Sequence, residues 1–185
     1  LTFDKQRCKE YLSAIGIRTA KATLLRAGQA YDSSAIAAAM GLPLFVKPNK
    51  NGSSYGAAKA DNTEALTSAI ENAFRYDDEI LVEEFLQGKE VTCGAMIING
   101  KVTALPITEI RTKQAFFDYQ AKYEGASEEI TPAEIDAELY ASIQRTTETI
   151  YQHLGFKGMC RIDYIITNDQ YYMLEVNSIP GLSEE

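Results

Sequence analysis

Apolar residues recur at helical spacing in three segments of the first half of the chain, with short extended apolar runs between them. Cys8 and Leu12 mark one face of a first helix, for which we expect Thr2 as the N-cap and Gly16 as the end. The segment 61–64, Asp-Asn-Thr-Glu, has the form of a capping box in front of an amphipathic helix. We therefore predict helices over residues 2–16, 33–41 and behind the capping box, and strands over residues 23–25, 43–47 and 79–84, with a return strand from Tyr55.

The second half opens with a different period. Val91, Cys93 and Ala95 alternate with more polar residues, as is typical of a strand with one buried face. Asn99-Gly100 then predicts a tight hairpin turn, after which residues 102–107 form the returning strand. The chain therefore reads as two α+β halves, which meet near residues 84–88.

The stretch that follows, residues 111–129, is polar and aromatic without a clear period, and we predict a long loop there. A loop of this length in a compact domain is usually functional or disordered. Thr131 and Pro132 then predict the start of a long helix with proline at its first position. The apolar stripe of this helix would comprise Ile135, Leu139, Ile143 and Ile150.

Two short strands near the end of the sequence carry acids in alternation. Arg161 and Asp163 share one face of the first strand, and Glu175 and Asn177 share one face of the second. If the connecting loop takes three residues, 168–170, Asp163 lies opposite Glu175 and Arg161 lies opposite Asn177. Carboxylate and amide oxygens beside one guanidinium suit Mg²⁺ carrying a polyphosphate.

The totals restrict the partners of the chain. Its 185 residues have a formal charge of −8, with 45% apolar and 24% charged residues, so we expect a globular protein that binds no nucleic acid. The longest largely apolar stretch, residues 35–46, is too short to span a membrane. Three distant cysteines predict free thiols in a reducing cytoplasm. Because the sequence begins at Leu1 inside a helical pattern, we interpret it as a piece of a longer protein.

Two further segments offer chemistry, each with a simpler alternative. Residues 47–56, Lys-Pro-Asn-Lys-Asn-Gly-Ser-Ser-Tyr-Gly, could cradle phosphate oxygens with backbone N–H groups and aim Lys47 at them, or could be an ordinary polar turn. Residues 81–86 lead to Glu90 and could form a hinge that contacts a purine while Glu90 binds ribose hydroxyls. They could equally be a strand with solvated acids, and spacing alone does not choose between these.

The predicted long loop contains residues 116–123, Phe-Phe-Asp-Tyr-Gln-Ala-Lys-Tyr, in which aromatics surround Lys122. One interpretation is a loop anchored by aromatic contacts with Lys122 exposed. The other is a mobile lid whose lysine binds phosphate.

Taken together and in this order, these segments resemble the ATP-grasp superfamily and, within it, the D-alanine–D-alanine ligases. The resemblance covers essentially the whole chain. The motifs that carry it are Phe3-Asp4-Lys5, Lys47-Pro48 through Gly52-Ser53-Ser54, Val82-Glu83 to Glu90, Phe117-Asp118-Tyr119 through Lys122-Tyr123, Arg161-Ile162-Asp163, and Glu175-Val176-Asn177-Ser178-Ile179-Pro180-Gly181.

The resemblance implies an α+β fold of the ATP-grasp type, in which two α+β subdomains sandwich the nucleotide. Residues 1–86 would be the central, small subdomain, and residues 87–185 the C-terminal subdomain with the metal site and the ω-loop. It also implies roles for individual residues. Lys5, Lys47, Ser54 and Lys122 would bind the ATP phosphates; Glu83, Glu84, Leu86 and Glu90 the nucleoside; Asp163, Glu175 and Asn177 two Mg²⁺ ions, or Mn²⁺ in their place; Arg161 would stabilise charge on the reacting acyl oxygens; Ser53 and Tyr123 would organise the substrates; and the Gly181 backbone would approach the second alanine.

The implied reaction phosphorylates the carboxylate of one D-alanine, after which the amine of a second D-alanine attacks. It would supply a peptidoglycan precursor in the cytoplasm, in a parent protein that is a homodimer. Tyr123 after Lys122 favours D-alanine over D-lactate as acceptor. The rivals are a ligase for another amino acid or peptide and a non-catalytic nucleotide-binding module.

The sequence departs from the family pattern in four ways. The preceding domain, with an acid and a histidine for the first alanine, is missing from it. After Gly181 the family continues to a substrate-binding serine and a closing helix, whereas this sequence ends at Glu185. Tyr55 replaces a small aliphatic residue, and Glu84 replaces a common lysine. We therefore expect this piece to bind ATP with Mg²⁺ but to turn over poorly or not at all.

Overall fold

A computed structural model describes residues 1–112 and 127–181 of the chain. The chain divides into two compact units. The first comprises Leu1, residues 3–9 and residues 20–86; the second comprises Thr2, residues 10–19 and the described residues from Gln87 onward. Predicted residues Lys122 and Tyr123 lie outside the described part.

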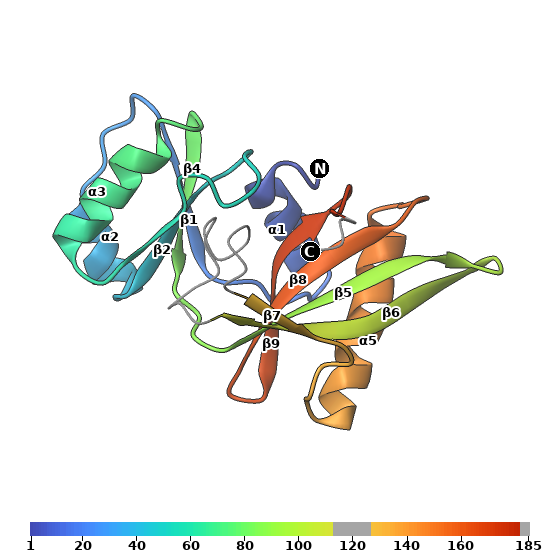
Figure 1. Cartoon of the computed structure of the whole chain (residues 1–185). Coiled ribbons are helices and arrows are strands. Elements are labelled where there is room, and N and C mark those ends of the chain that lie inside the picture. Colours follow the sequence, from blue (N-terminus) through green and yellow to red (C-terminus); the bar gives the residue numbers. More distant parts are fainter. Residues whose placement is uncertain (113–126, 182–185) are drawn as a thin grey trace. The chain divides into compact units, whose positions relative to one another are not determined.

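The first unit is built on a four-stranded antiparallel sheet in the order β1-β4-β2-β3. Helix α3 packs against β2, β3 and β4, and helix α2 packs against α3 (Figure 1). Leu44, Val46 and Ile70 are among the fully buried residues between sheet and helix, so the core forms from the predicted apolar strands and amphipathic helix. The elements are α1 (Lys5–Ala14, whose last five residues group with the second unit), β1 (Ala22–Arg26), α2 (Ser33–Met40), β2 (Leu44–Pro48), β3 (Ala58–Ala60), α3 (Thr63–Ala73) and β4 (Glu79–Glu84).

Two helix starts differ from the prediction by one or two residues. Asp4, not Thr2, caps α1, because its side chain accepts a hydrogen bond from the Arg7 N–H at 3.0 Å. Asn62 caps α3 by accepting from the Ala65 N–H at 2.8 Å, so the predicted capping box does not form. The predicted strand from Tyr55 starts later, at β3, because residues 53–56 form a turn in which Ser53, Ser54 and Gly56 have positive φ.

The second unit contains a five-stranded antiparallel sheet in the order β7-β6-β5-β8-β9, with helix α5 against β5 and β6 (Figure 1). Val91, Cys93 and Ala95 are buried as their alternation predicts. The Asn99-Gly100 turn between β5 and β6 is confirmed, with positive φ at both residues. The elements are β5 (Lys89–Ile98), β6 (Lys101–Thr112), β7 (Ser127–Ile130), α5 (Ala137–His153), β8 (Cys160–Thr167) and β9 (Gln170–Asn177).

The edges of the predicted long loop belong to the sheet. Strand β6 extends to Thr112 and pairs with β7, so the loop prediction was wrong at residues 111–112 and 127–129. The remaining residues of that loop are outside the described part.

Helix α5 begins later than Thr131-Pro132 predicts. The Ala133 N–H donates to the Ile107 carbonyl at 2.7 Å, which ties this segment to β6 rather than to a helix. Asp136 is the N-cap instead, and its carboxylate accepts from the N–H groups of Glu138 and Leu139. Ile135 therefore precedes the helix.

Strands β8 and β9 form the acidic hairpin, which has the predicted cross-strand pairs although its turn is shorter than predicted. Asp163 lies opposite Glu175 and Arg161 opposite Asn177, as expected. The turn, however, takes two residues, Asn168 and Asp169, both with positive φ. A β-bulge supplies the missing residue: Tyr164 pairs with Met173, so one residue of β9, Leu174, has no partner. Met173 is consequently buried, whereas an unbroken alternation from Glu175 and Asn177 would bury Leu174.

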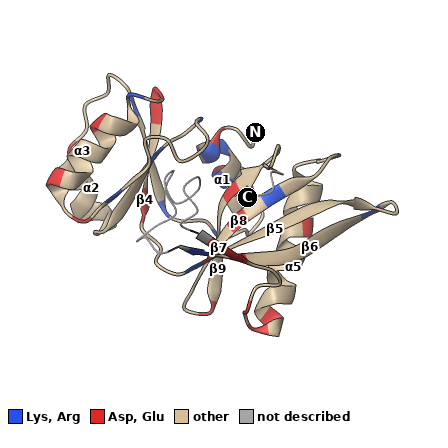
Figure 2. Ribbon diagram, viewed as in Figure 1, with Lys and Arg blue, Asp and Glu red and all other residues tan. Residues whose placement is uncertain are grey.

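The three cysteines are unpaired, as predicted, and all three are buried. No helix within residues 1–112 and 127–181 is both long and apolar enough to cross a bilayer. Acidic and basic residues are interspersed along the elements of both units, as Figure 2 shows.

Candidate functional site

The predicted phosphate lysine Lys47 lies in a buried ion-pair cluster of the first unit. Strand register places β2 beside β4, and Lys47 Nζ lies 2.8 Å from Glu83 Oε2. The other carboxylate oxygen of Glu83 accepts from Lys9 Nζ, which comes from α1. The Glu83 side chain is 4% exposed and that of Lys47 13% exposed. One carboxylate thus fixes two lysines.

Opposing effects set the charges of this cluster. Burial alone would raise the pKa of the Glu83 carboxyl, but the charges of Lys47 and Lys9 outweigh it and hold that pKa below its ordinary value. Burial lowers the pKa of Lys9, and the attraction of Glu83 does not fully offset this. Glu83 is therefore an ionised, buried anchor, and its side chain is engaged with lysines rather than free to contact a base.

The glycine-containing loop after β2 has an uncommon backbone. Ser53 and Ser54 have φ values of 54° and 56°, in the left-handed region that non-glycine residues seldom adopt. Gly56 has φ 73°, and a Cβ there would approach Tyr76 Cδ2 within 2.5 Å, so this position requires glycine. Strained residues of this kind cluster at ligand clamps. Lys5 Nζ donates to the Asn51 carbonyl at 2.6 Å, which places a second predicted phosphate lysine at the same loop.

The predicted nucleoside segment is ordered by backbone contacts. The Glu84 carboxylate accepts from the Lys21 N–H at 2.8 Å, while the Glu84 N–H donates to the Lys21 carbonyl at 3.0 Å. The Glu84 side chain is therefore tied to the chain just before β1. Leu86 is half-buried in the first unit, and Glu90 is half-buried on β5 of the second unit.

The predicted metal residues Asp163, Glu175 and Asn177 lie together with Arg161 on one face of the β8–β9 hairpin, which we call the acidic patch. The Arg161 guanidinium donates to both oxygens of Asp163, at 2.8 and 3.2 Å, and Asn177 Nδ2 donates to Asp163 Oδ2 at 2.8 Å. Glu175 lies opposite Asp163 in the strand register. Burial alone would lower the pKa of Arg161, but the charges of Asp163 and Glu175 outweigh it and raise that pKa. Arg161 is thus permanently charged and held in place.

These residues fit a magnesium ion that carries a polyphosphate. Among the described residues, no three His, Cys, Asp or Glu side chains cluster as a self-sufficient metal site. Mg²⁺ is commonly held by one or two carboxylates together with substrate phosphates. Two carboxylates and an amide oxygen on one face match this donor set. Thr92, opposite Asp163 on β5, adds a buried hydroxyl for which residues 1–112 and 127–181 offer no hydrogen-bond partner.

The structure thus collects the predicted residues in two groups. Lys5, Lys47, Ser53, Ser54 and Glu83 belong to the first unit; Arg161, Asp163, Glu175 and Asn177 belong to the second. The Gly181 residue is exposed.

Sequence reasoning missed Lys9. Its signal was present, because Lys5, Lys9 and Leu12 follow one helical face on which a lysine interrupts buried residues. It also missed Asn49, which is fully buried.

Comparisons with known proteins agree with this geometry. A family model described as "D-ala D-ala ligase C-terminus" matches residues 11–185. The D-alanine–D-alanine ligase of Bacteroides fragilis is 44% identical over 184 residues, which is 99% of this chain and 57% of the relative. This chain therefore spans little more than half the length of that curated relative.

Two solved structures are similar as well. The VanG D-Ala:D-Ser ligase of Enterococcus faecalis has a TM-score of 0.83 and 36% identity, covering 98% of this chain and 53% of that one. The Bacillus anthracis D-alanine–D-alanine ligase complexed with ATP has a TM-score of 0.80 and 28% identity, covering 98% and 56%. The two sheets and their helices are those of an ATP-grasp fold. Within that class, the chain belongs to the D-alanine–D-alanine ligase family and matches its C-terminal part.

Proposed function

We propose that this chain is the nucleotide-binding part of an ATP-dependent D-alanine–D-alanine ligase. The observation that carries the proposal is the register of β8 and β9, which gathers Arg161, Asp163, Glu175 and Asn177 on one face. The relative in Bacteroides fragilis and the ATP complex from Bacillus anthracis support it.

Each group has a role that follows from its chemistry. Lys5 and Lys47 would neutralise phosphate charge beside the loop of Ser53 and Ser54, whose hydroxyls and backbone would contact substrate and phosphate. Glu83 would hold Lys47 in place, since its carboxylate is 2.8 Å from that ammonium. The backbone near Glu84 and Leu86 would face the base, and Glu90 the ribose.

The acidic patch would act on the transferring phosphoryl group. Asp163, Glu175 and Asn177 would hold Mg²⁺, which supplies a Lewis acid that neutralises phosphate charge. Arg161, oriented by its two hydrogen bonds to Asp163, would stabilise negative charge on the acyl oxygens. Such fixed charges need no reorganisation during the reaction.

The remaining assignments follow the family. Lys122 would bind phosphate, Tyr123 would help organise substrate, and the Gly181 backbone would approach the second D-alanine. We also propose a cytoplasmic, homodimeric parent that makes a peptidoglycan precursor. One rival is favoured by an observation of its own: the likeness to the VanG D-Ala:D-Ser ligase supports D-serine as the alternative acceptor.

Nucleotide titration of this chain with and without Mg²⁺ tests the site. We expect Mg²⁺-dependent ATP binding that weakens by about tenfold or more in Glu175→Gln, because a metal ligand is lost. Asp169→Asn is the matched control, since it removes one charge from the exposed turn of the same hairpin. Equal affinity in wild type and Glu175→Gln would refute the metal assignment.

Phosphate release from ATP by the full-length parent tests the reaction. We expect release that depends on D-alanine and exceeds that seen when D-serine or D-lactate is the second substrate. Faster release with D-serine as acceptor would favour the alternative ligase. Release that ignores D-alanine would refute the ligase proposal.

A further inference from the structure

Asn49 is a fully buried residue that directly follows β2 and precedes the loop of residues 50–56. Its amide NH₂ donates to Asp4 Oδ1 at 3.0 Å and to Glu79 Oε2 at 3.2 Å, and its amide oxygen accepts from the Gln6 N–H at 2.9 Å. Its backbone N–H donates to the Glu79 carbonyl at 2.9 Å, and its carbonyl accepts from the Lys5 N–H at 3.2 Å. Every polar group of this residue is used.

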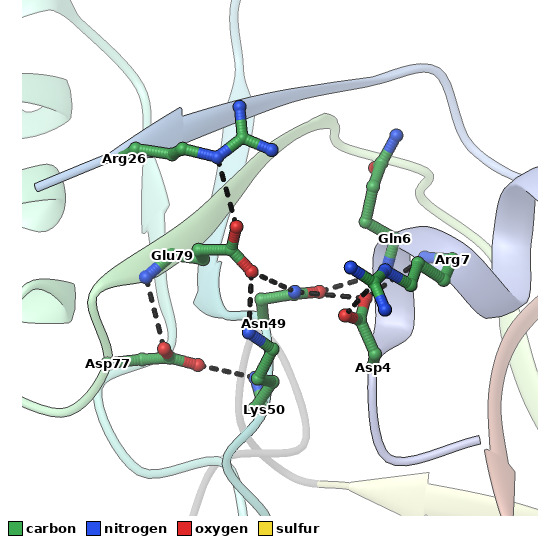
Figure 3. Close-up of polar contacts among 8 residues, drawn as sticks. All are labelled: Asp4, Gln6, Arg7, Arg26, Asn49, Lys50, Asp77 and Glu79. Carbon is green, nitrogen blue, oxygen red and sulfur yellow. Dashed lines mark hydrogen bonds and ion pairs between the residues drawn. The ribbon is translucent and has the colours of Figure 1, made fainter. Parts of the chain in front are cut away.

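These bonds join three elements at one point (Figure 3). Asp4 is the N-cap of α1, Lys5 and Gln6 begin its first turn, and Glu79 begins β4. Asn49 itself follows β2. A buried amide that lost these partners would leave polar groups without hydrogen bonds, so the three elements are held in one arrangement.

The loop beyond Asn49 is bonded to the same cluster of residues. Lys50 continues the same cluster, with Nζ 2.7 Å from Glu79 Oε2 and its N–H donating to Asp77. Lys5, whose backbone is bonded to Asn49, sends its own Nζ to the Asn51 carbonyl at 2.6 Å. The amide therefore fixes both the start of the loop and the helix that carries a phosphate lysine.

The surroundings explain why an amide occupies this position. Asp4 and Glu79 both accept from it, and Arg7, Arg26 and Lys50 neutralise these two acids from outside. An aspartate has the same shape but no NH₂ donor, and it would place a third carboxylate against the first two. Only the neutral amide satisfies both acids and the Gln6 N–H together.

We propose that Asn49 is a positioning residue for nucleotide binding: it clamps the glycine-containing loop to the first turn of α1 and to β4. This inference rests on the proposed function, because it assigns the loop to ATP phosphates. Asn49 acts through Lys5 and the loop backbone.

The test compares ATP·Mg²⁺ titrations of wild type, Asn49→Ala, Asn49→Asp and the control Asn62→Ala. The control removes a helix N-cap in the same unit without touching the loop. We expect both Asn49 variants to raise the Kd about tenfold, whereas Asn62→Ala, despite a lower Tm, changes it less than about twofold. An unchanged Kd in Asn49→Ala, or an equal rise in Asn62→Ala, would overturn the inference.

Hydrogen exchange of the backbone amides at residues 50–57, without nucleotide, separates the two proposals. If wild type binds no ATP, the proposed function fails, and exchange alone decides the role of Asn49. We expect faster exchange of this loop in Asn49→Ala than in wild type or Asn62→Ala. Equal exchange in all three proteins would show that Asn49 clamps nothing.

Discussion

Replacing Glu83 by glutamine should strongly destabilise the first unit. The carboxylate is the shared counter-charge of Lys9 and Lys47, and its side chain is 4% exposed. Glu83→Gln keeps the shape but removes the carboxylate charge that both buried ammonium groups contact. Removing one partner from a buried ion pair typically costs about 3–5 kcal/mol. For a chain of this length that corresponds to a fall in Tm of roughly 6–20 °C.

Lys9→Met should cost less than Glu83→Gln. Burial already lowers the pKa of Lys9, so its charge is disfavoured in the folded state relative to water. Glu83 also keeps Lys47 when Lys9 is replaced. The double variant should recover part of the loss of Glu83→Gln, since one uncompensated ammonium is then gone, with a coupling energy of about 0.5–3 kcal/mol.

Urea unfolding followed by circular dichroism measures these free energies, because the sequence has no tryptophan to serve as a fluorescent probe. Arg75→Met is a suitable control, since it removes a positive charge from an exposed position of the same unit, where substitutions change stability little. A loss below about 1 kcal/mol in Glu83→Gln, or a larger loss in Lys9→Met, would refute the reasoning about buried charge.

Three further outcomes are expected in the second unit. Burial alone would raise the pKa of Glu109, but Arg111 and Lys89 hold that pKa below its ordinary value of 4.5. The ionised carboxylate therefore stabilises the fold above pH 4.5, and this stabilisation is lost as the pH falls below that value. The Tm should drop more steeply on acidification in wild type than in Glu109→Gln. Gly88→Ala should lose about 1–3 kcal/mol in urea unfolding, since its Cβ would lie 1.9 Å from a backbone oxygen; an unchanged midpoint would contradict this. Thr147→Val should cost about 1–3 kcal/mol by leaving the buried Tyr164 hydroxyl, 2.8 Å away, without its partner, and adding Tyr164→Phe should restore part of that loss; no restoration would count against the hydrogen bond.

Much of the fold could be predicted because the local pattern and the tertiary environment agree. Strand β4 has the predicted bounds, Glu79–Glu84, since an apolar run flanked by acids marks both the burial and its limits. The Asn99-Gly100 turn was predictable because both residues tolerate positive φ. Prediction failed where a hydrogen bond between residues far apart in the sequence determines where an element begins. Ala133 pairs with Ile107 far away in sequence, and this contact overrides the helix start that Pro132 suggests.

The candidate site divides in the same way. The pairing of Asp163 with Glu175 follows from a period of two within one hairpin, so sequence reasoning could find it. Lys9 and Glu83 are 74 positions apart, and no local pattern links them. Asn49 looked like one more polar loop residue, because its burial depends on α1 and β4 arriving from elsewhere in the chain.

The unpaired Leu174 makes the chemistry of the hairpin a question of parity. Because side chains alternate between the faces of a sheet, a two-residue turn followed by an unbroken ladder would pair Asp163 with Leu174 and place Glu175 opposite Ile162. Glu175 and Asn177 would then face the core and Val176 would face outward. The bulge absorbs Leu174 and returns Glu175 to the face of Asp163. We infer that sequences descended from this one can lose the bulge and keep the site only if the number of residues between Asp163 and Glu175, or the length of the turn, changes by one at the same time.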